Sequence, residues 1–293
     1  MPLASIADLN GPIAEVTQCI EMAKKLSLYY DDYVALDQDG ADREPGIHAS
    51  ELYPCLRKPV YSLLGVPRKP AVPKYWKQRF KMGKAIHLML QQDFHALSKR
   101  SLKNEAMRVA SAMAEEMDCY IEFEEEVPVG PAHQELAKYW NLRSHADGVF
   151  TFRKKDTGLV ILRVGLEIKS EAMDGYDKLK EPKSEHVRQG HVYMAALDLP
   201  LMWFMYMNKN NQNNTDSKAP WLVTWQPKVW EEVEARFRTI HDHASANNIP
   251  ERSEGIWCQF CPWAYHCQPD TMMKGFQNTK PPGRRETIRR QGT

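Results

Sequence analysis

The chain lacks the features of a secreted or membrane-embedded protein. Its first five residues, Met1 to Ser5, begin no long apolar run of the kind that a signal peptide contains. No stretch stays apolar over the roughly 20 residues that a membrane span needs. The sequence therefore predicts a soluble, cytoplasmic protein without a membrane partner.

An excess of one sign of charge is also missing. The 293 residues contain 39 Lys and Arg against 38 Asp and Glu, which gives a formal net charge of +1. A basic surface over the whole chain is thereby excluded. Any contact with nucleic acid must come from a local basic patch.

A complete phosphate-binding loop is absent as well. The pair Gly83-Lys84 resembles the end of such a loop, but no glycine precedes it at the required spacing and no Ser or Thr follows it. The sequence therefore excludes a motor driven by a nucleoside triphosphate.

The apolar pattern changes its period along the chain and indicates a mixed fold. Helical spacing gives way to alternation near residue 120. Expected helices cover 12–36, a short stretch within 50–64, two segments within 74–119, then 183–197 and 230–244, and expected strands cover 120–129, 139–152, 159–168, 201–207 and 221–225. We expect a bulge at Gly148 and a turn over 154–158. This order predicts an α/β fold with a mixed central sheet flanked by helices.

Two carboxylates and a lysine are expected near one strand end. Glu167 and Lys169 are two residues apart on a predicted strand, so their side chains share a face. Asp147 ends the preceding strand, and a hairpin could bring it beside Glu167. Converging carboxylates suit Mg²⁺ or Mn²⁺, and a neighbouring lysine can balance charge on a phosphate under attack. The alternative is a surface strand with one charged face.

Three polar residues on predicted helices could join this site. The imidazole of His87 can serve as a further metal ligand. Gln189 and Tyr193 are four residues apart and share a helix face, from which they could hold DNA or the lysine. The alternatives are an ordinary helix histidine and an ordinary polar stripe.

The cysteines indicate metal binding rather than disulfides, because the chain is long and shows no secretion signal. Four are candidate ligands: Cys55, Cys258, Cys261 and Cys267. Four thiolates can hold zinc, whereas the five-residue gap and the aromatic surroundings favour an iron–sulfur cluster. Unpaired buried cysteines are the alternative. Cys19 and Cys119 fall within predicted helices and are interpreted as core residues.

These motifs, in this order, resemble the PD-(D/E)XK nuclease superfamily. Within it they are similar to the RecB-type exonucleases with an iron–sulfur cluster, which include the CRISPR-associated adaptation nuclease and AddB-type nuclease domains. The family pattern falls on Cys55 with Arg57, His87, Asp147, Glu167 and Lys169, Gln189 and Tyr193, and Cys258, Cys261 and Cys267. The match spans residues 48–268. Ser144 departs from it, because the family often has glycine three residues before the motif aspartate.

The resemblance implies a restriction-endonuclease-like core over residues 46–268 with a C-terminal iron–sulfur segment. A helical extension, 1–45, would precede this core, and a basic disordered tail, 269–293, would follow it. The four cysteines would hold a [4Fe-4S] cluster. Asp147, Glu167, His87 and the carbonyl of Ile168 would hold Mg²⁺ or Mn²⁺.

The implied activity is that of a metal-dependent deoxyribonuclease, an exonuclease that acts on DNA and favours single strands. The resemblance places it in recombination, repair, phage DNA processing or CRISPR adaptation, with a protein partner from recombination, replication or CRISPR adaptation. Two rival interpretations stay open. One is a structure-specific flap endonuclease with a structural metal site. The other is a catalytically silent scaffold that binds nucleic acid.

Overall fold

The computed structural model describes residues 44–53, 55–68, 74–98, 118–171, 173–209, 221–255, 258 and 261–267. The expected helix 12–36, the second helix within 74–119, Cys19 and the tail 269–293 lie outside these ranges. None of the helices in the described ranges is long and apolar enough to cross a membrane.

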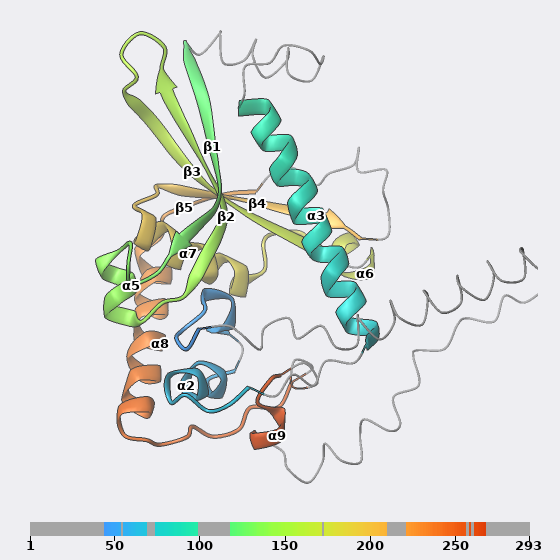
Figure 1. Cartoon of the computed structure of the whole chain (residues 1–293), viewed down its shortest axis with the longest axis vertical. Helices are drawn as coiled ribbons and strands as arrows, with labels where there is room; N and C mark the ends of the chain where they lie inside the picture. Colours follow the sequence, from blue (N-terminus) through green and yellow to red (C-terminus); the bar gives the residue numbers. More distant parts are fainter. Residues whose placement is uncertain are drawn as a thin grey trace, which may run out of the picture.

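A five-stranded mixed sheet forms the centre of the fold (Figure 1). Its strands, in their order across the sheet, are β1 (Cys119–Val129), β2 (Ser144–Lys154), β3 (Val160–Glu171), β4 (Leu201–Asn208) and β5 (Trp221–Thr224). The first three form an antiparallel meander, β3 and β4 are parallel, and β4 and β5 are antiparallel. A parallel pair needs a crossover, and the chain makes it through two helices. The predicted α/β fold with a mixed central sheet is confirmed.

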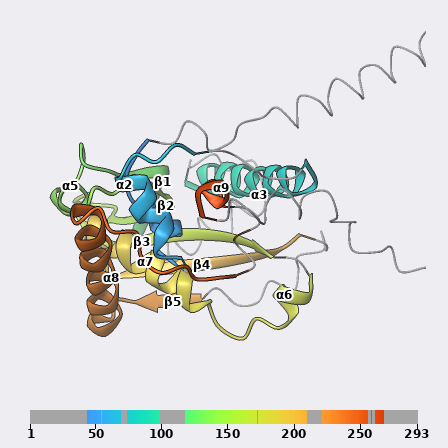
Figure 2. The same ribbon diagram turned by 90° about the horizontal axis from the view of Figure 1, so that it is seen from below.

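Helices cover both faces of this sheet (Figure 2). The long helix α3 (Lys74–Ser98) packs on one face, where its Leu90 and Phe94 contact Phe123 and Phe150. The opposite face buries residues of α7 and α8 together with the shorter N-terminal elements. The remaining helices are η1 (Ala49–Glu51), α2 (Arg57–Leu63), α5 (Glu135–Trp140), α6 (Met173–Asp177), α7 (Ser184–Leu197), α8 (Pro227–Ser245) and α9 (Ala264–Cys267).

The alternation of side chains reverses in β1 and β2 at the same level of the sheet. Phe123 belongs to the cluster under α3, whereas Val127 belongs to the opposite cluster, although an even separation should keep one face. The side chains of β2 divide in the same way. Glu126 has a left-handed backbone with φ 49°. Glu126 and Asp147 do not pair, although the pairing of β1 with β2 continues on both sides of them. The regular alternation therefore does not determine where Asp147 points.

The expected strand 139–152 begins later than predicted. Its first residues belong to α5, and Asn141 caps the end of this helix with a left-handed φ of 50°. The buried ring of Trp140 stacks on Phe237 of α8 at a centroid distance of 5.1 Å. This tertiary contact accounts for the apolar side chain of Trp140, which the sequence pattern assigned to a strand.

Two further expectations were wrong. Cys119 is the first residue of β1 rather than part of a helix, although it is buried as expected. Gly148 forms no bulge, because it pairs regularly with Glu125 and Leu166. A Cβ at Gly148 would lie 2.4 Å from a ring carbon of Phe123, so the glycine makes room for that ring.

A second glycine sets how closely α7 approaches the sheet. A Cβ at Gly190 would lie 2.5 Å from the ring of Phe204, a fully buried residue of β4. Gly190→Ala should therefore destabilise the fold by about 1–3 kcal/mol, with the better helix propensity of alanine offsetting part of the overpacking. Denaturant unfolding measures the change.

The matched control is Gly255→Ala, because nothing lies within 4 Å of a Cβ at Gly255. This control should change the free energy of unfolding by no more than about 0.5 kcal/mol. Equal stability of both variants would mean that the contact between Gly190 and Phe204 does not limit the packing of α7.

Candidate active site

The candidate site lies where β2 and β3 part. Their ladder ends at the pair of Gly148 and Leu166, and the next backbone donor on β3 is the N–H of Ile168. The side chain of Asp147 takes the place of a strand partner there, because its Oδ2 accepts that N–H at 2.6 Å. The carboxylate of Asp147 is thus fixed beside the segment of β3 that carries Glu167 and Lys169.

Glu167 and Lys169 form a close pair on the face of β3 that α7 covers. The Lys169 Nζ lies 2.5 Å from Glu167 Oε1, and only 2% of Glu167 is exposed. Their spacing of two residues places both on one side of the strand, as the sequence predicted. A buried carboxylate is thereby held against a cation that the same strand supplies.

Gln189 connects this pair to α7. Its Oε1 accepts from Lys169 Nζ at 3.1 Å, while its Nε2 lies 2.8 Å from Glu167 Oε1 and 3.0 Å from the hydroxyl of Tyr193. Gln189 and Tyr193 are one helical turn apart and both are buried. The amide therefore holds the lysine and the glutamate in one arrangement.

The environment of the pair changes its protonation. Burial raises the pKa of Glu167 to about 7, with Lys169 acting to lower it and Asp147 acting to raise it. Burial acts to lower the pKa of Lys169, but the charges of Glu167 and Asp147 outweigh burial and leave that pKa raised. The lysine accordingly stays a fixed positive charge inside the site.

His87 reaches the same site from α3, on the other face of the sheet. Its Nδ1 lies 3.3 Å from Asp147 Oδ1, the carboxylate oxygen that Ile168 does not engage. Burial acts to lower the pKa of His87, but the hydrogen bond and charge of Asp147 outweigh it and raise that pKa. Asp147 therefore lies between a residue of α3 and the backbone of β3.

The donors present suit a hard divalent cation. Glu167 Oε2 is buried and makes no hydrogen bond to any described residue, which is costly for a carboxylate oxygen. Carboxylate oxygens are the ligands that Mg²⁺ and Mn²⁺ prefer. Within the described ranges, however, no three His, Cys, Asp or Glu side chains are already arranged around one metal position. Lys169 engages Glu167 Oε1, the Ile168 N–H engages Asp147 Oδ2, and His87 lies beside Asp147 Oδ1.

Sequence reasoning missed one residue at this site. Gln91 follows His87 by one turn of α3 and donates from Nε2 to the carbonyl of Asp147 at 2.9 Å. The spacing of four residues from a candidate ligand is the signal that could have identified it. Ser144, the departure from the family pattern, accepts the N–H of Ala49 on its hydroxyl at 2.8 Å.

A second group of candidates, the four cysteines, lies apart from these residues. All four line one small cavity of 20 Å³, together with Arg57, Lys58 and Tyr61; the cysteines are Cys55, Cys258, Cys261 and Cys267. The Arg57 guanidinium lies 3.1 Å from the Cys267 Sγ and also donates to the carbonyl of Pro250. Each of these thiols is free, and burial raises the pKa of Cys261. The fold thus collects thiols from both ends of the described chain beside two cations.

The segment around the last cysteines is anchored to the N-terminal part. Trp263 is fully buried, and its Nε1 donates to the carbonyl of Val66 at 2.9 Å. The guanidinium of Arg68 lies 4.6 Å from the centroid of the same ring. Trp263 therefore packs inside the protein.

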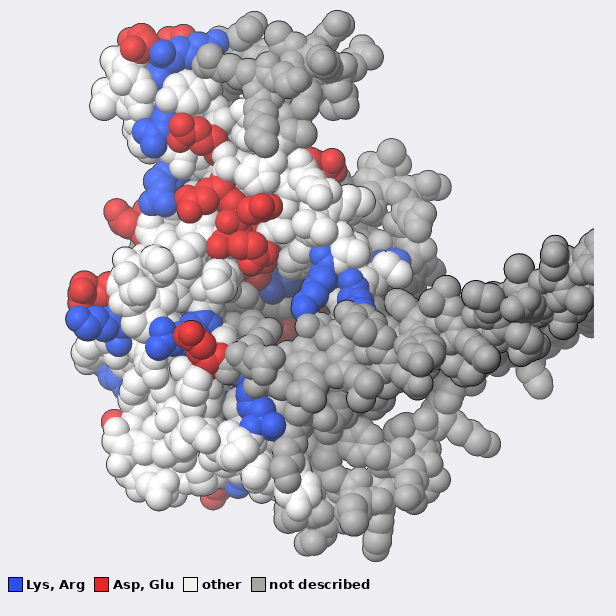
Figure 3. Space-filling view, in the orientation of Figure 1, with Lys and Arg blue, Asp and Glu red and all other residues white. Residues whose placement is uncertain are grey.

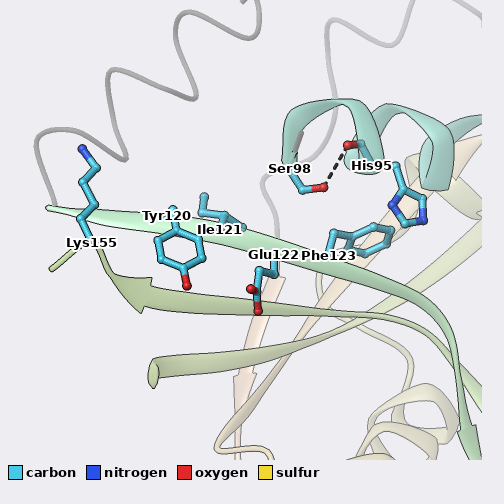
Figure 4. Close-up of a pocket in the computed structure, with 7 residues that line it drawn as sticks. All are labelled: His95, Ser98, Tyr120, Ile121, Glu122, Phe123 and Lys155. Atoms are coloured by element: carbon cyan, nitrogen blue, oxygen red, sulfur yellow. Dashed lines mark hydrogen bonds between the residues drawn. The ribbon is translucent and has the colours of Figure 1, made fainter. Parts of the chain in front are cut away.

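A wider pocket of 610 Å³ lies between the C-terminal part of α3 and β1 (Figure 4). Its lining consists of His95, Ser98, Tyr120, Ile121, Glu122, Phe123 and Lys155. It includes none of the candidate catalytic residues. The strand beside it also carries the exposed Glu124, Glu125 and Glu126, and Figure 3 shows acidic side chains gathered on this side of the molecule. Such a surface repels a phosphate backbone.

Comparisons with known proteins give only distant structural matches. No protein-family model matches the sequence, and no curated protein matches it. The crystal structure of SSO0001 has a TM-score of 0.41 and 14% identity, covering 85% of this chain and 97% of that one. The structure of LHK-Exo in complex with dAMP has a TM-score of 0.44 and 14% identity, and the match covers 71% of this chain and 91% of that one. The structure of the alkaline exonuclease LHK-Exo from Laribacter hongkongensis has a TM-score of 0.37 and 16% identity, and the match covers 71% of this chain and 91% of that one.

A partly buried histidine near the site has a lowered pKa. The hydroxyl of Tyr206 accepts the Lys183 N–H at 3.1 Å and lies 2.6 Å from His186 Nδ1. A neutral ring whose Nδ1 carries no proton can accept the hydroxyl hydrogen of Tyr206. Burial, with the charges of Lys169 and Lys183, lowers the pKa of His186 to about 3.

This shift predicts an acid-dependent loss of stability. Between its ordinary pKa of 6.5 and about 3, His186 binds a proton in the unfolded chain but not in the folded one, so stability falls as the pH falls. Between pH 7 and pH 5 the free energy of unfolding should fall by roughly 1–2 kcal/mol less in His186→Gln than in the wild type. Thermal or denaturant unfolding at the two pH values measures this.

The control for this prediction is His133→Gln, at an exposed histidine. It should retain the acid dependence of the wild type. Identical pH profiles for the wild type and His186→Gln would show that His186 accepts a proton in the folded protein.

Proposed function

We propose that the chain is a metal-dependent DNA exonuclease that hydrolyses phosphodiester bonds, favours single-stranded DNA and belongs among the RecB-type PD-(D/E)XK nucleases. One observation carries the proposal: a buried glutamate, Glu167, is paired with Lys169 on one strand face, beside the carboxylate of Asp147. Carboxylates that converge beside a fixed cation suit hydrolysis of an anionic ester.

Each candidate residue has a chemical role in this proposal. The ligands of one or two Mg²⁺ or Mn²⁺ ions would be Asp147, Glu167, His87 and the carbonyl of Ile168. A bound ion would neutralise charge on the phosphate and supply hydroxide at neutral pH. Lys169 would stabilise the charge that develops on the phosphate oxygens. Because Gln189 already holds Lys169, and Tyr193 holds Gln189, the lysine needs little reorganisation during the reaction.

The cysteines would hold a [4Fe-4S] cluster in the same proposal. Their thiols share one cavity with Arg57 and Lys58, whose positive charges would offset the negative charge of thiolate ligands. A cluster there would join the segment before α2 to the segment after α8. It would act on stability and on the shape of the DNA entry rather than on hydrolysis.

A second candidate function is a flap endonuclease with one structural zinc ion. The cavity between the thiols, 20 Å³, favours this rival, because it is close to the space that one water molecule occupies. The iron and zinc contents of anaerobically purified protein separate the two metals. A circular single strand separates the activities, since an exonuclease needs a DNA end.

The proposed activity predicts the effect of removing either member of the buried pair. Glu167→Ala and Lys169→Ala should each lower the rate of Mn²⁺-dependent hydrolysis of end-labelled single strands by about 10²–10³ or more. The reason is the loss of a metal ligand or of the charge that stabilises the transition state. Matched controls are Glu231→Ala and Lys228→Ala, at exposed positions of α8, which should retain activity.

Circular dichroism and iron content show whether the variants remain folded. Hydrolysis at nearly the wild-type rate by either folded variant of the pair would remove this strand from the mechanism. Absence of hydrolysis by the wild type on linear single strands, double strands and flaps would refute the nuclease proposal itself.

The proposed cluster predicts coupling between metal content and folding. Cys55 is far from the other three cysteines in the sequence, so a cluster would close a long loop and constrain the unfolded chain. Cys55→Ser should therefore lose iron and unfold at lower temperature. Cys119→Ser, at a buried cysteine outside the cavity, should keep its iron. Equal iron in the wild type and Cys55→Ser would exclude Cys55 as a ligand.

A further inference from the structure

Gln91 holds the backbone of Asp147 from the helix that also carries His87. Gln91 is only 3% exposed. Its Nε2 donates to the Asp147 carbonyl and to Glu126 Oε1, both at 2.9 Å. Since His87 and Gln91 are four residues apart, they lie on one face of α3. One residue contacts the Asp147 carboxylate and the other its main chain.

The sheet itself leaves this position without its normal support. The ladder between β1 and β2 is interrupted at Glu126 and Asp147, although the pairs on both sides stay in register. A carbonyl inside a sheet that leaves the ladder needs another donor, because an unsatisfied buried polar group is costly. The side-chain amide of Gln91 provides that donor to Asp147.

The same amide also acts on the strained partner strand. Glu126 has φ 49°, a conformation that costs a non-glycine residue about 1–2 kcal/mol. Its carboxylate accepts the second hydrogen bond of Gln91. One buried side chain therefore holds both residues at the interruption, on which the direction of the Asp147 side chain depends.

We propose that Gln91 is a positioning residue that sets the affinity of the site for its divalent cation by holding Asp147. The proposal rests on the proposed function, in which Asp147 is a metal ligand. From this fixed backbone, Asp147 directs Oδ2 to the Ile168 N–H and Oδ1 toward His87. A ligand that is free to shift binds its metal less tightly, which is why partners of ligands contribute to affinity.

Mn²⁺ binding to the full-length protein, measured by electron paramagnetic resonance, tests this without relying on DNA cleavage. Gln91→Leu removes the donor and should weaken Mn²⁺ binding by about tenfold or more. The matched control is Gln92→Leu, at the next residue of the same helix, whose side chain is exposed. This control should bind Mn²⁺ as tightly as the wild type.

A second variant covers the case in which Gln91→Leu does not fold. Gln91→Met keeps a long side chain with similar helix propensity but has no donor for the Asp147 carbonyl, so it should also weaken Mn²⁺ binding. A merely structural role would lower the melting temperature and leave the dissociation constant for Mn²⁺ unchanged. That result in a folded Gln91 variant would overturn the inference.

The two proposals fail in different ways. If the wild type binds Mn²⁺, Glu167→Ala loses it and the folded Gln91 variants bind like the wild type, only the role of Gln91 is wrong. If the wild type binds no Mn²⁺, the proposed function fails, and the inference that rests on it fails too.

Discussion

The burial of the Glu167 carboxylate is the constraint on which the rest of this site depends. A charged oxygen away from water is stable only with partners, and two charges inside a protein repay their desolvation only in good geometry. Lys169 and Gln189 provide that geometry at Glu167 Oε1. The second oxygen makes no such bond within the described chain. The protein thus holds one oxygen of the carboxylate, and the other is the oxygen that the proposed metal ion would engage.

This arrangement requires α7 to lie very close to the sheet. Gly190 lets the helix approach Phe204, and the neighbouring Gln189 thereby reaches Glu167 on β3, the last strand of the meander. Together with α6, the same helix makes the crossover between the parallel strands β3 and β4. One helix therefore fulfils both the topological requirement of the sheet and the polar requirement of the buried pair.

The opposite face of the sheet contributes through α3. His87 and Gln91 contact Asp147 from that side, where the strand ladder is interrupted and cannot hold it. In another part of the fold, the cavity that the cysteines share and the packing of Trp263 bring the two ends of the described chain together. The contacts of α3 with Asp147 and the cavity of the cysteines each bring together residues that are distant in sequence.

Local spacing was enough to predict much of this protein. An interval of two on a strand places Glu167 beside Lys169, and an interval of four on a helix places Gln189 beside Tyr193. The period of the apolar residues likewise predicts most strands and helices, since it depends only on backbone geometry. Tertiary contacts decided the rest: Trp140 belongs to a helix because it stacks on Phe237, and Asp147 points to Ile168 because the ladder breaks at Glu126. No local period encodes a contact between distant segments, because such a contact exists only once the chain has packed.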